Sequence, residues 1–218
     1  MKTVLIIGAS GQVGQAMLQL ALQNSDILKV VAPSRRPLPP HAKLENPIVD
    51  FDKLPEGASW WKVDLVLCSL GTTLRQAKSK LGFYKVDHDY ILATAKLAHQ
   101  AGTPAFCLVS SLGANLSSRI FYLRVKGETE RDISALGFDS LTIVRPSLLI
   151  AGPRSQRPLE GIGLFIGKHM AALLPCRYQA VPIHQVARAL LNAGLSNPAG
   201  FHMIESEQIP DCNQEREY

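Results

Sequence analysis

The segment Thr3-Val-Leu-Ile-Ile7 runs directly into Gly8-Ala-Ser-Gly11-Gln-Val-Gly14, so an apolar run ends in three glycines within seven residues. The run is typical of a buried strand, and the following residues, to about Gln23, have the amphipathic pattern of a helix. Glycines at such a junction let the backbone turn sharply and approach a ligand, while unpaired helix N–H groups face an anion. The junction therefore predicts a pyrophosphate cradle. Simple turn chemistry is the alternative, because the spacing is not Gly-x-Gly-x-x-Gly.

Length and composition indicate one globular domain. The chain has 218 residues, 46% of them hydrophobic, and a mean hydropathy of +0.07. It has no run of about 18 apolar residues, the length that crosses a bilayer, and its first segment is a strand rather than a signal sequence. We therefore expect no membrane partner. The four cysteines lack disulfide or metal-ligand spacing, so we expect no metal and a reducing, cytoplasmic location. They are Cys68, Cys107, Cys176 and Cys212, of which the first two lie in apolar runs and are expected to pack as small hydrophobic groups.

The net charge is +5, from 23 Lys and Arg against 18 Asp and Glu. The densest basic stretch, residues 75–80, holds three positive charges. We interpret it as a solvated loop and expect no nucleic-acid partner, with nucleic-acid binding as the alternative. A modestly basic surface also suits a phosphorylated cofactor or an acidic substrate.

Strands and helices alternate along the sequence. Strands are expected at 3–7, 27–32, 47–51, 63–69, 105–109 and 140–144, and later helices at 84–100, 118–136 and 184–195. This alternation predicts an α/β fold, in which a doubly wound parallel sheet has helices on both faces. The polar residues 205–218 are expected to form a frayed tail.

The end of the second expected strand indicates which dinucleotide binds. An NAD site usually has an Asp or Glu there for the ribose hydroxyls. This chain has Ser34-Arg35-Arg36 instead. The planar donor fork of arginine suits the 2′-phosphate of NADP, so we predict NADP(H) rather than NAD(H). The alternative is a solvated pair of loop arginines.

Tyr122 and Lys126 are four residues apart in an expected helix and share one face. A cation beside a phenol favours the phenolate and makes the hydroxyl a better proton-transfer group. Ser110 and Ser111 follow the preceding expected strand, where a hydroxyl could hydrogen-bond a substrate carbonyl. The alternative is that Tyr122 is a packing residue and Lys126 a surface lysine.

These motifs carry a family resemblance that runs from about Lys2 to Ile204. The glycine spacing, the serine after the fifth strand and Tyr122-x-x-x-Lys126 resemble the short-chain dehydrogenase/reductase superfamily. A closer resemblance is to the Tat-interacting-protein-like atypical oxidoreductases. It rests on Leu70-Gly-Thr-Thr73, Val86-Asp-x-Asp-Tyr90, Tyr122-Leu-x-Val-Lys-Gly-Glu128 and Arg145-Pro146.

The resemblance implies a Rossmann-like NAD(P)-binding domain over residues 1–204 and a role for each matching residue. Tyr122 would be the general acid/base, Lys126 would hold the nicotinamide ribose, and Ser111 or Ser110 would orient the substrate. The implied cofactor contacts are Gly8, Ser10, Gly11, Gln12, Val13 and Gly14 at the pyrophosphate, Arg35 and Arg36 at the 2′-phosphate, Asp50 at the adenine, Leu70 and Gly71 along the adenosine and ribose, Leu149 near the carboxamide, and Arg157. For Leu149 and Arg157, core packing and surface charge are the alternatives.

Together these features predict an NADP-dependent oxidoreductase that transfers a hydride to or from a small carbonyl or alcohol. The substrate pocket is expected in a Gly/Pro-rich segment, about 147–181, interpreted as a flap, with His169 and His184 as possible lining residues. Two alternatives stay open. One is a redox-sensing regulator or adaptor that binds NADP(H) without turnover and has a protein partner; the other is an isomerase that uses bound NADP transiently.

Overall fold

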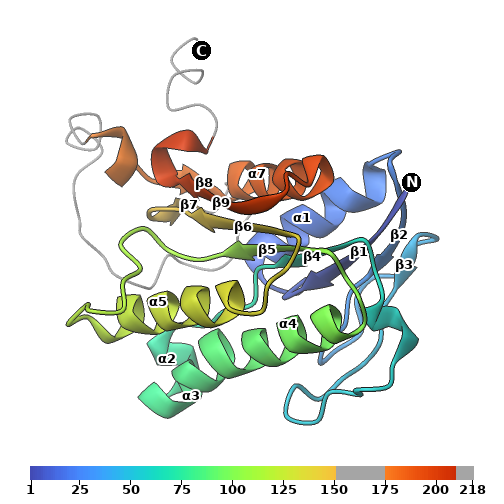
Figure 1. Cartoon of the computed structure of the whole chain (residues 1–218), viewed down its shortest axis with the longest axis horizontal. Coiled ribbons are helices and arrows are strands. Elements are labelled where there is room, and N and C mark those ends of the chain that lie inside the picture. The colour runs from blue at the N-terminus through green and yellow to red at the C-terminus, as the bar shows by residue number, and fades with distance from the viewer. Residues whose placement is uncertain (151–174, 210–218) are drawn as a thin grey trace.

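The computed structural model describes residues 1–150 and 175–209 and shows one parallel sheet between two layers of helices (Figure 1). The strand order is β3-β2-β1-β4-β5-β6-β9, and each neighbouring pair is parallel. The predicted doubly wound α/β fold is therefore confirmed. No helix of the described ranges is long and apolar enough to cross a bilayer.

The strands are β1 (Lys2–Ile7), β2 (Ile27–Val31), β3 (Leu44–Glu45), β4 (Leu65–Cys68), β5 (Ala105–Val109), β6 (Ser140–Arg145) and β9 (Gly200–Glu205), with β7 (Leu149–Ile150) and β8 (Val181–Pro182) forming a separate parallel pair. The α-helices are α1 (Gln12–Gln23), α2 (Leu74–Ala77), α3 (Lys80–Tyr84), α4 (Tyr90–Gln100), α5 (Phe121–Ser134) and α7 (Ile183–Ser196). Shorter turns are the 3-10 helices η1 (Ser59–Trp61), η3 (Cys176–Tyr178) and η4 (Ser206–Gln208) and the π-helix η2 (Lys85–Asp89). Most of the expected substrate segment 147–181, with Arg157 and His169, lies outside the described residues.

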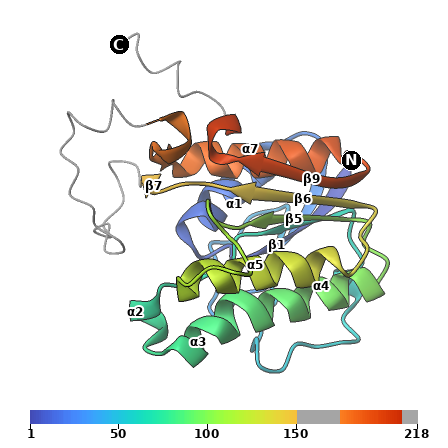
Figure 2. The same cartoon turned by 60° about the vertical axis from the view of Figure 1, so that its left-hand side comes forward.

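The two helix layers bury opposite faces of the sheet. Helices α1 and α7 lie together on one face, and α4 and α5 cover the other (Figure 2). Successive side chains of a strand point to opposite faces. Accordingly Val4 and Ile6 of β1 pack with the α1/α7 layer, and Leu5 and Ile7 pack with the core under α4. This explains why the apolar run of β1 is continuous rather than alternating.

The expected third strand at 47–51 is wrong. The strand beside β2 is β3, two residues long and slightly earlier in the chain, and 47–51 contributes only an isolated bridge between Ser34 and Ile48. Pro47 has no N–H to give to a strand ladder. Asp50 then turns the chain, because its carboxylate accepts the N–H of Asp52.

The sequence reading also missed the last strand of the sheet. Strand β9 pairs with β6 along its whole length, and η4 follows it with a reciprocal cap between Glu205 and Gln208. Ile209 is 2% exposed and belongs to the core under α7. Ordered structure thus continues five residues into the range expected to be a tail.

The expected helix at 84–100 is the later part of a longer helical run. Helix α3 begins at Lys80, passes through η2 and continues as α4 to Gln100. A π-helical turn inserts an extra residue into the helix and changes which side chains face inward. Here that turn carries Asp87 and His88, both buried.

Candidate cofactor site and active site

The glycine loop between β1 and α1 is packed against backbone on two sides. Gly8 has a φ of 88°, and a Cβ there would lie 2.6 Å from the backbone nitrogen of Leu70. A Cβ on Gly14 would lie 2.0 Å from the carbonyl oxygen of Gly8. Gly11 differs, because its Cβ would meet only that same oxygen, at 3.3 Å. Gly8 and Gly14 are therefore required by the fold, whereas Gly11 leaves room on the outer side of the loop.

The first turn of α1 presents an anion-binding arrangement. Gly11 is the N-cap and supplies no side-chain cap, and no acidic residue lies in the first turn. The first N–H groups of a helix have no partner within it and carry the positive end of its dipole. The Val13 side chain is 7% exposed and belongs to the core, so only its backbone can face a ligand. Ser10 and Gln12 are both exposed.

Arg35 and Arg36 lie just after β2, and both are exposed. They are on the loop that follows the carboxyl end of this strand, the edge where sheets of this kind bind nucleotides. Asp50 is also exposed, beyond β3, and its carboxylate accepts a backbone N–H within its own turn. The adenine contact expected for Asp50 stays a prediction.

Asn46 fixes the backbone of the arginine loop, and sequence reasoning missed it. Its amide nitrogen donates to the carbonyl oxygen of Ala32 at 2.5 Å and to the Ser34 hydroxyl at 2.8 Å. Its amide oxygen accepts the N–H of Leu38 at 2.8 Å. One side chain thus joins both ends of the loop that carries the two arginines. A polar residue directly after a short strand was the signal available in the sequence.

Lys126 and Tyr122 lie one turn apart on α5, but their environments differ. Lys126 is 6% exposed, and its Nζ lies 2.8 Å from Oδ1 of Asp87. The alternative of a surface lysine is therefore wrong. Tyr122 is half-buried, with its ring centroid 6.0 Å from Lys126 Nζ and 5.6 Å from the ring of Phe83. A Cβ on Gly71 would lie 3.7 Å from Lys126 Nζ, so the loop after β4 passes beside the lysine.

Electrostatics keeps Lys126 charged. Burial by itself lowers the pKa of this ammonium, but the Asp87 carboxylate, together with smaller contributions that include Tyr122, outweighs burial and raises the pKa above its ordinary value. The nearby thiol of Cys68 stays neutral, because burial raises its pKa to about 12. Burial likewise raises the pKa of Cys107 to about 12, and both cysteines pack in the core as expected.

Two serine hydroxyls follow β5, as expected, in different environments. Ser110 is buried, and its hydroxyl has no hydrogen-bond partner within the described ranges. Ser111 is half-buried, and its hydroxyl donates to the carbonyl oxygen of Leu112 at 3.3 Å. Neither hydroxyl bonds to Tyr122 in the described part of the chain, so which serine orients a substrate stays a prediction.

Arg145, at the end of β6, braces the fold. Its guanidinium donates to both carboxylate oxygens of Glu130 on α5, at 2.9 and 2.5 Å, and to Glu205 on β9 at 3.2 Å. The hydrogen bonds that Arg145 donates to Glu130 raise the pKa of Arg145 above its ordinary value, against the effect of burial. Leu149, in β7, is half-buried and packs against the α1/α7 core, which agrees with core packing and leaves the carboxamide contact untested.

Asp87 is the second residue that sequence reasoning missed. It lies in the motif Val86-Asp-x-Asp-Tyr90 but received no role of its own. Its signal was position: Asp87 falls on the same helical face as Ile91, Ala95 and Ala98, which are all buried. A carboxylate in an apolar stripe must have a partner.

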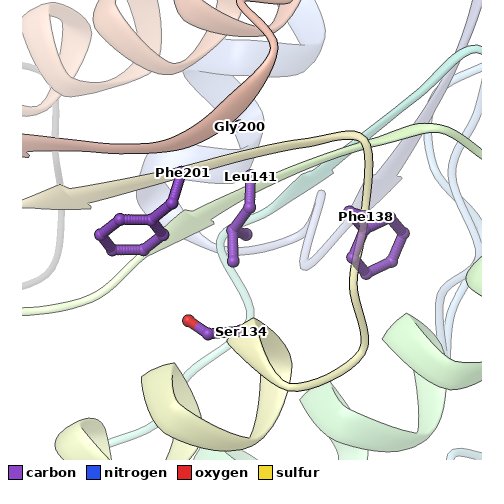
Figure 3. A pocket seen from close by; sticks show the side chains of 5 residues that line it. All are labelled: Ser134, Phe138, Leu141, Gly200 and Phe201. Atoms are coloured by element: carbon purple, nitrogen blue, oxygen red, sulfur yellow. The ribbon is translucent and has the colours of Figure 1, made fainter.

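The structure thus brings the glycine loop, Gly71, Asp87, Lys126 and Tyr122 to the carboxyl ends of β1 and β4. One hollow lies elsewhere, at the amino ends of β6 and β9 (Figure 3). It is lined by Ser134, Phe138, Leu141, Gly200 and Phe201. It contains none of the predicted site residues and is separate from the candidate site.

A family model described as NAD(P)H-binding matches residues 8–193. The chain belongs to this family. Protein HTATIP2 of Rattus norvegicus is 37% identical over 217 residues, covering 95% of this chain and 88% of the relative. Protein fmp52, mitochondrial, of Emericella nidulans is 34% identical over 227 residues, covering 96% of this chain and 94% of the relative. The resemblance to the Tat-interacting-protein-like NAD(P)-binding proteins is therefore confirmed. Because the fungal relative is named mitochondrial, these names do not support the expected cytoplasmic location.

Solved structures show the same fold at low identity. MoeE5 in complex with UDP-glucose and NAD superposes with a TM-score of 0.70 at 20% identity, over 92% of this chain and 74% of that chain. UDP-glucuronic acid 4-epimerase of Bacillus cereus, in complex with UDP-glucuronic acid and NAD, gives a TM-score of 0.68 at 15% identity, over 93% of this chain and 77% of that chain. The family is thus NAD(P)H-binding, and the fold is shared with structures solved in complex with NAD.

Proposed function

We propose that this protein is an NADP(H)-dependent oxidoreductase that acts on a small carbonyl or alcohol. The observation that carries the proposal is the buried Lys126 ammonium, one helical turn from Tyr122 and beside the loop after β4. Burying an ammonium group is energetically costly unless an opposite charge compensates it, as Asp87 does here. A protein that only bound a dinucleotide would need the glycine loop and not this arrangement.

The residues present fit a dinucleotide. The outer side of Gly11 and the uncapped first turn of α1 would hold the pyrophosphate, and Arg35 and Arg36 would pair with the 2′-phosphate. When bound, the nicotinamide supplies or accepts the hydride. No acidic residue stands at the arginine positions to read a ribose 2′-hydroxyl, which favours NADP(H) over NAD(H).

Tyr122 would move the proton. The residue is only half-buried, so its hydroxyl would be able to reach a ligand, and a phenol can give a proton to a carbonyl oxygen as that oxygen becomes an alcohol. Lys126 would orient the ribose side of the site, and the Ser111 or Ser110 hydroxyl would hold the substrate oxygen. A small-molecule substrate rather than a protein partner follows from this proton-transfer set.

The test is turnover of a panel of carbonyl substrates with NADPH, for the parent protein and Tyr122→Phe. We expect Tyr122→Phe to lower turnover by about a hundredfold or more, the scale of general acid–base catalysis, with NADPH affinity nearly unchanged. Tyr90→Phe is the matched control, because Tyr90 is the first residue of α4 and its hydroxyl donates to the exposed Asp52. Full turnover in Tyr122→Phe would remove this tyrosine from the mechanism. NADPH binding with no turnover on any substrate would favour the redox-sensing regulator.

A further inference from the structure

Two segments that the proposed function does not use lie side by side on the surface. Residues 75–80, expected to form a solvated loop, instead include most of α2 and the first residue of α3. They lie beside the start of α5 (Figure 2), where Lys80 Nζ and Arg124 Cζ are 5.5 and 5.8 Å from the ring centroid of Phe121. Residues 74–81 and 116–124 together are called the basic-apolar face below.

The basic-apolar face adjoins the candidate site. Helix α2 is capped by Thr73, whose side chain accepts the N–H of Gln76. Thr73 ends the loop after β4, in which a Cβ on Gly71 would lie 3.7 Å from Lys126 Nζ. The face therefore lies at the carboxyl edge of the sheet, next to the residues proposed for proton transfer.

Charge of one sign is concentrated on this face. Its two segments contain no Asp or Glu and five cations, which are Arg75, Lys78, Lys80, Arg119 and Arg124. The rest of the chain has 18 Lys and Arg (23 minus 5) against 18 Asp and Glu, so the charge of the face equals the whole net charge of +5. Glu128 approaches Arg124 only at 3.9 Å, and a partly exposed pair of this kind is weak. A surface of one sign attracts a partner of the opposite sign.

Exposed aliphatic side chains lie among these cations. Four of them are between 43% and 79% exposed: Leu74, Leu81, Leu116 and Ile120. A single exposed leucine needs no explanation, but four on one face form an apolar surface. Helix α2 has no buried residue at all, so Leu74 contributes nothing to the core. The face therefore combines positive charge with apolar side chains that the fold itself does not use.

This combination fits an anionic lipid bilayer better than other anionic partners. At a membrane surface, aliphatic side chains enter the boundary between headgroups and acyl chains while Lys and Arg attract anionic headgroups. A nucleic acid stacks its bases on aromatic side chains, and none of the four exposed hydrophobic residues is aromatic. Protein interfaces are depleted in lysine, of which this face has two.

We propose that the basic-apolar face docks this protein on an anionic lipid bilayer, with Leu81 and Ile120 in the headgroup region. The expectation of no membrane partner considered only spanning runs, which this kind of contact does not need. Docked in this way, the carboxyl edge of the sheet and the candidate site beside it face the bilayer. The inference goes beyond the proposed function and does not depend on it.

The first experiment tests the charges by sedimentation of the full chain with vesicles. We expect binding to phosphatidylcholine vesicles with about one-third phosphatidylserine to be at least tenfold tighter than to phosphatidylcholine alone, and to weaken with salt. The triple variant Lys78→Gln, Lys80→Gln and Arg119→Gln should bind about a hundredfold more weakly, because each cation near the surface contributes about fivefold.

The matched control removes the same charge elsewhere. Lys53, Lys62 and Lys96 are exposed and lie outside the face, so changing all three to Gln should weaken binding less than about threefold. Equal losses in the two triple variants, or no binding of the parent to the anionic vesicles, overturn the proposal.

A second experiment tests the apolar side chains without changing any charge. Leu81→Ser with Ile120→Ser should bind the anionic vesicles about tenfold more weakly. Leu28→Ser with Ile48→Ser is the control, because these side chains are 60% and 58% exposed outside the face and should not matter. Unchanged affinity of the first pair, or tighter binding of the parent to a DNA duplex than to the vesicles, overturns the assignment to lipid. These measurements use neither cofactor nor substrate, so their failure is separate from failure of the proposed function.

Discussion

Replacing Gly14 by alanine should destabilise the fold, whereas the same change at Gly11 should affect mainly the ligand. The Gly14 Cβ would stand 2.0 Å from Gly8 oxygen, and ordinary contacts begin at 3.4 Å, so the backbone must separate by about 1.4 Å. All three of its nearest neighbours are backbone atoms, which cannot rotate away. Overpacking of this kind costs about 3 kcal/mol at its upper end, and the better helix propensity of alanine returns about 1 kcal/mol. The net loss is about 2 kcal/mol of unfolding free energy.

Gly11→Ala is the matched control, because its Cβ would meet one atom at 3.3 Å. Alanine is a poorer N-cap than glycine, so we expect a loss below about 1 kcal/mol. Urea unfolding gives the stability of both variants, provided that the denaturant slope stays constant. Calorimetric titration with NADPH should show at least tenfold weaker binding for Gly11→Ala, whose methyl group would occupy the cradle. If the unfolding free energy of Gly14→Ala lies within about 0.5 kcal/mol of the parent value, the close approach of Gly8 and Gly14 does not control stability.

Two further predictions concern Asn46 and Asp132. Asn46→Ala removes the three hydrogen bonds that hold the arginine loop and should reduce the preference for NADPH over NADH at least threefold. Asn24→Ala is the control, because it loses a single hydrogen bond, to the N–H of Asp26, and should leave this preference unchanged. Equal effects of the two variants in titrations with NADPH and NADH would reject the role of Asn46. The hydrogen bond from Arg131, helped by His88 and opposed by burial, lowers the pKa of Asp132. Because the folded value is depressed, this carboxylate contributes stability above its ordinary pKa of 3.8 and loses that contribution as pH falls through the lowered value. The melting temperature of Asp132→Asn should therefore be lower than that of the parent at pH 7, and the difference between the two should narrow below about pH 4. A difference in melting temperature that is constant with pH would contradict this.

Local patterns were enough to predict much of this fold. Strand β5 occupies 105–109 as expected, and the run before Gly8 gives β1, because continuous apolar segments bounded by glycine or proline suit the interior of a parallel sheet. The expected strand at 47–51 is also mostly apolar, but Pro47 gives no N–H and Ile48 is 58% exposed. Strand β9 was missed because an edge strand is only half-buried, and its residues are a mixture of polar and apolar.

The candidate site likewise has residues that the sequence predicts and features that it does not. The glycines, Arg35, Arg36, Tyr122 and Lys126 could be found from spacing and residue chemistry. The burial of Lys126 could not, because it depends on Asp87, 39 residues earlier (126 minus 87). The helical spacing from Asp87 to Ile91 distinguishes Asp87 from Asp89, but it does not reveal the lysine that pairs with Asp87. Both aspartates lie in the π-helical turn, where the side chain of Asp87 is 1% exposed and that of Asp89 is 53% exposed.

Titration of the purified protein with NADPH and with NADH, under the same conditions and by calorimetry, tests the central claim most directly. We expect NADPH to bind at least tenfold more tightly than NADH, because charge-assisted bonds to a phosphate are among the stronger hydrogen bonds. Arg35→Ala combined with Arg36→Ala should remove most of that difference and leave NADH affinity nearly unchanged. Equal affinity of the parent protein for the two cofactors, or no binding of either, would contradict the account.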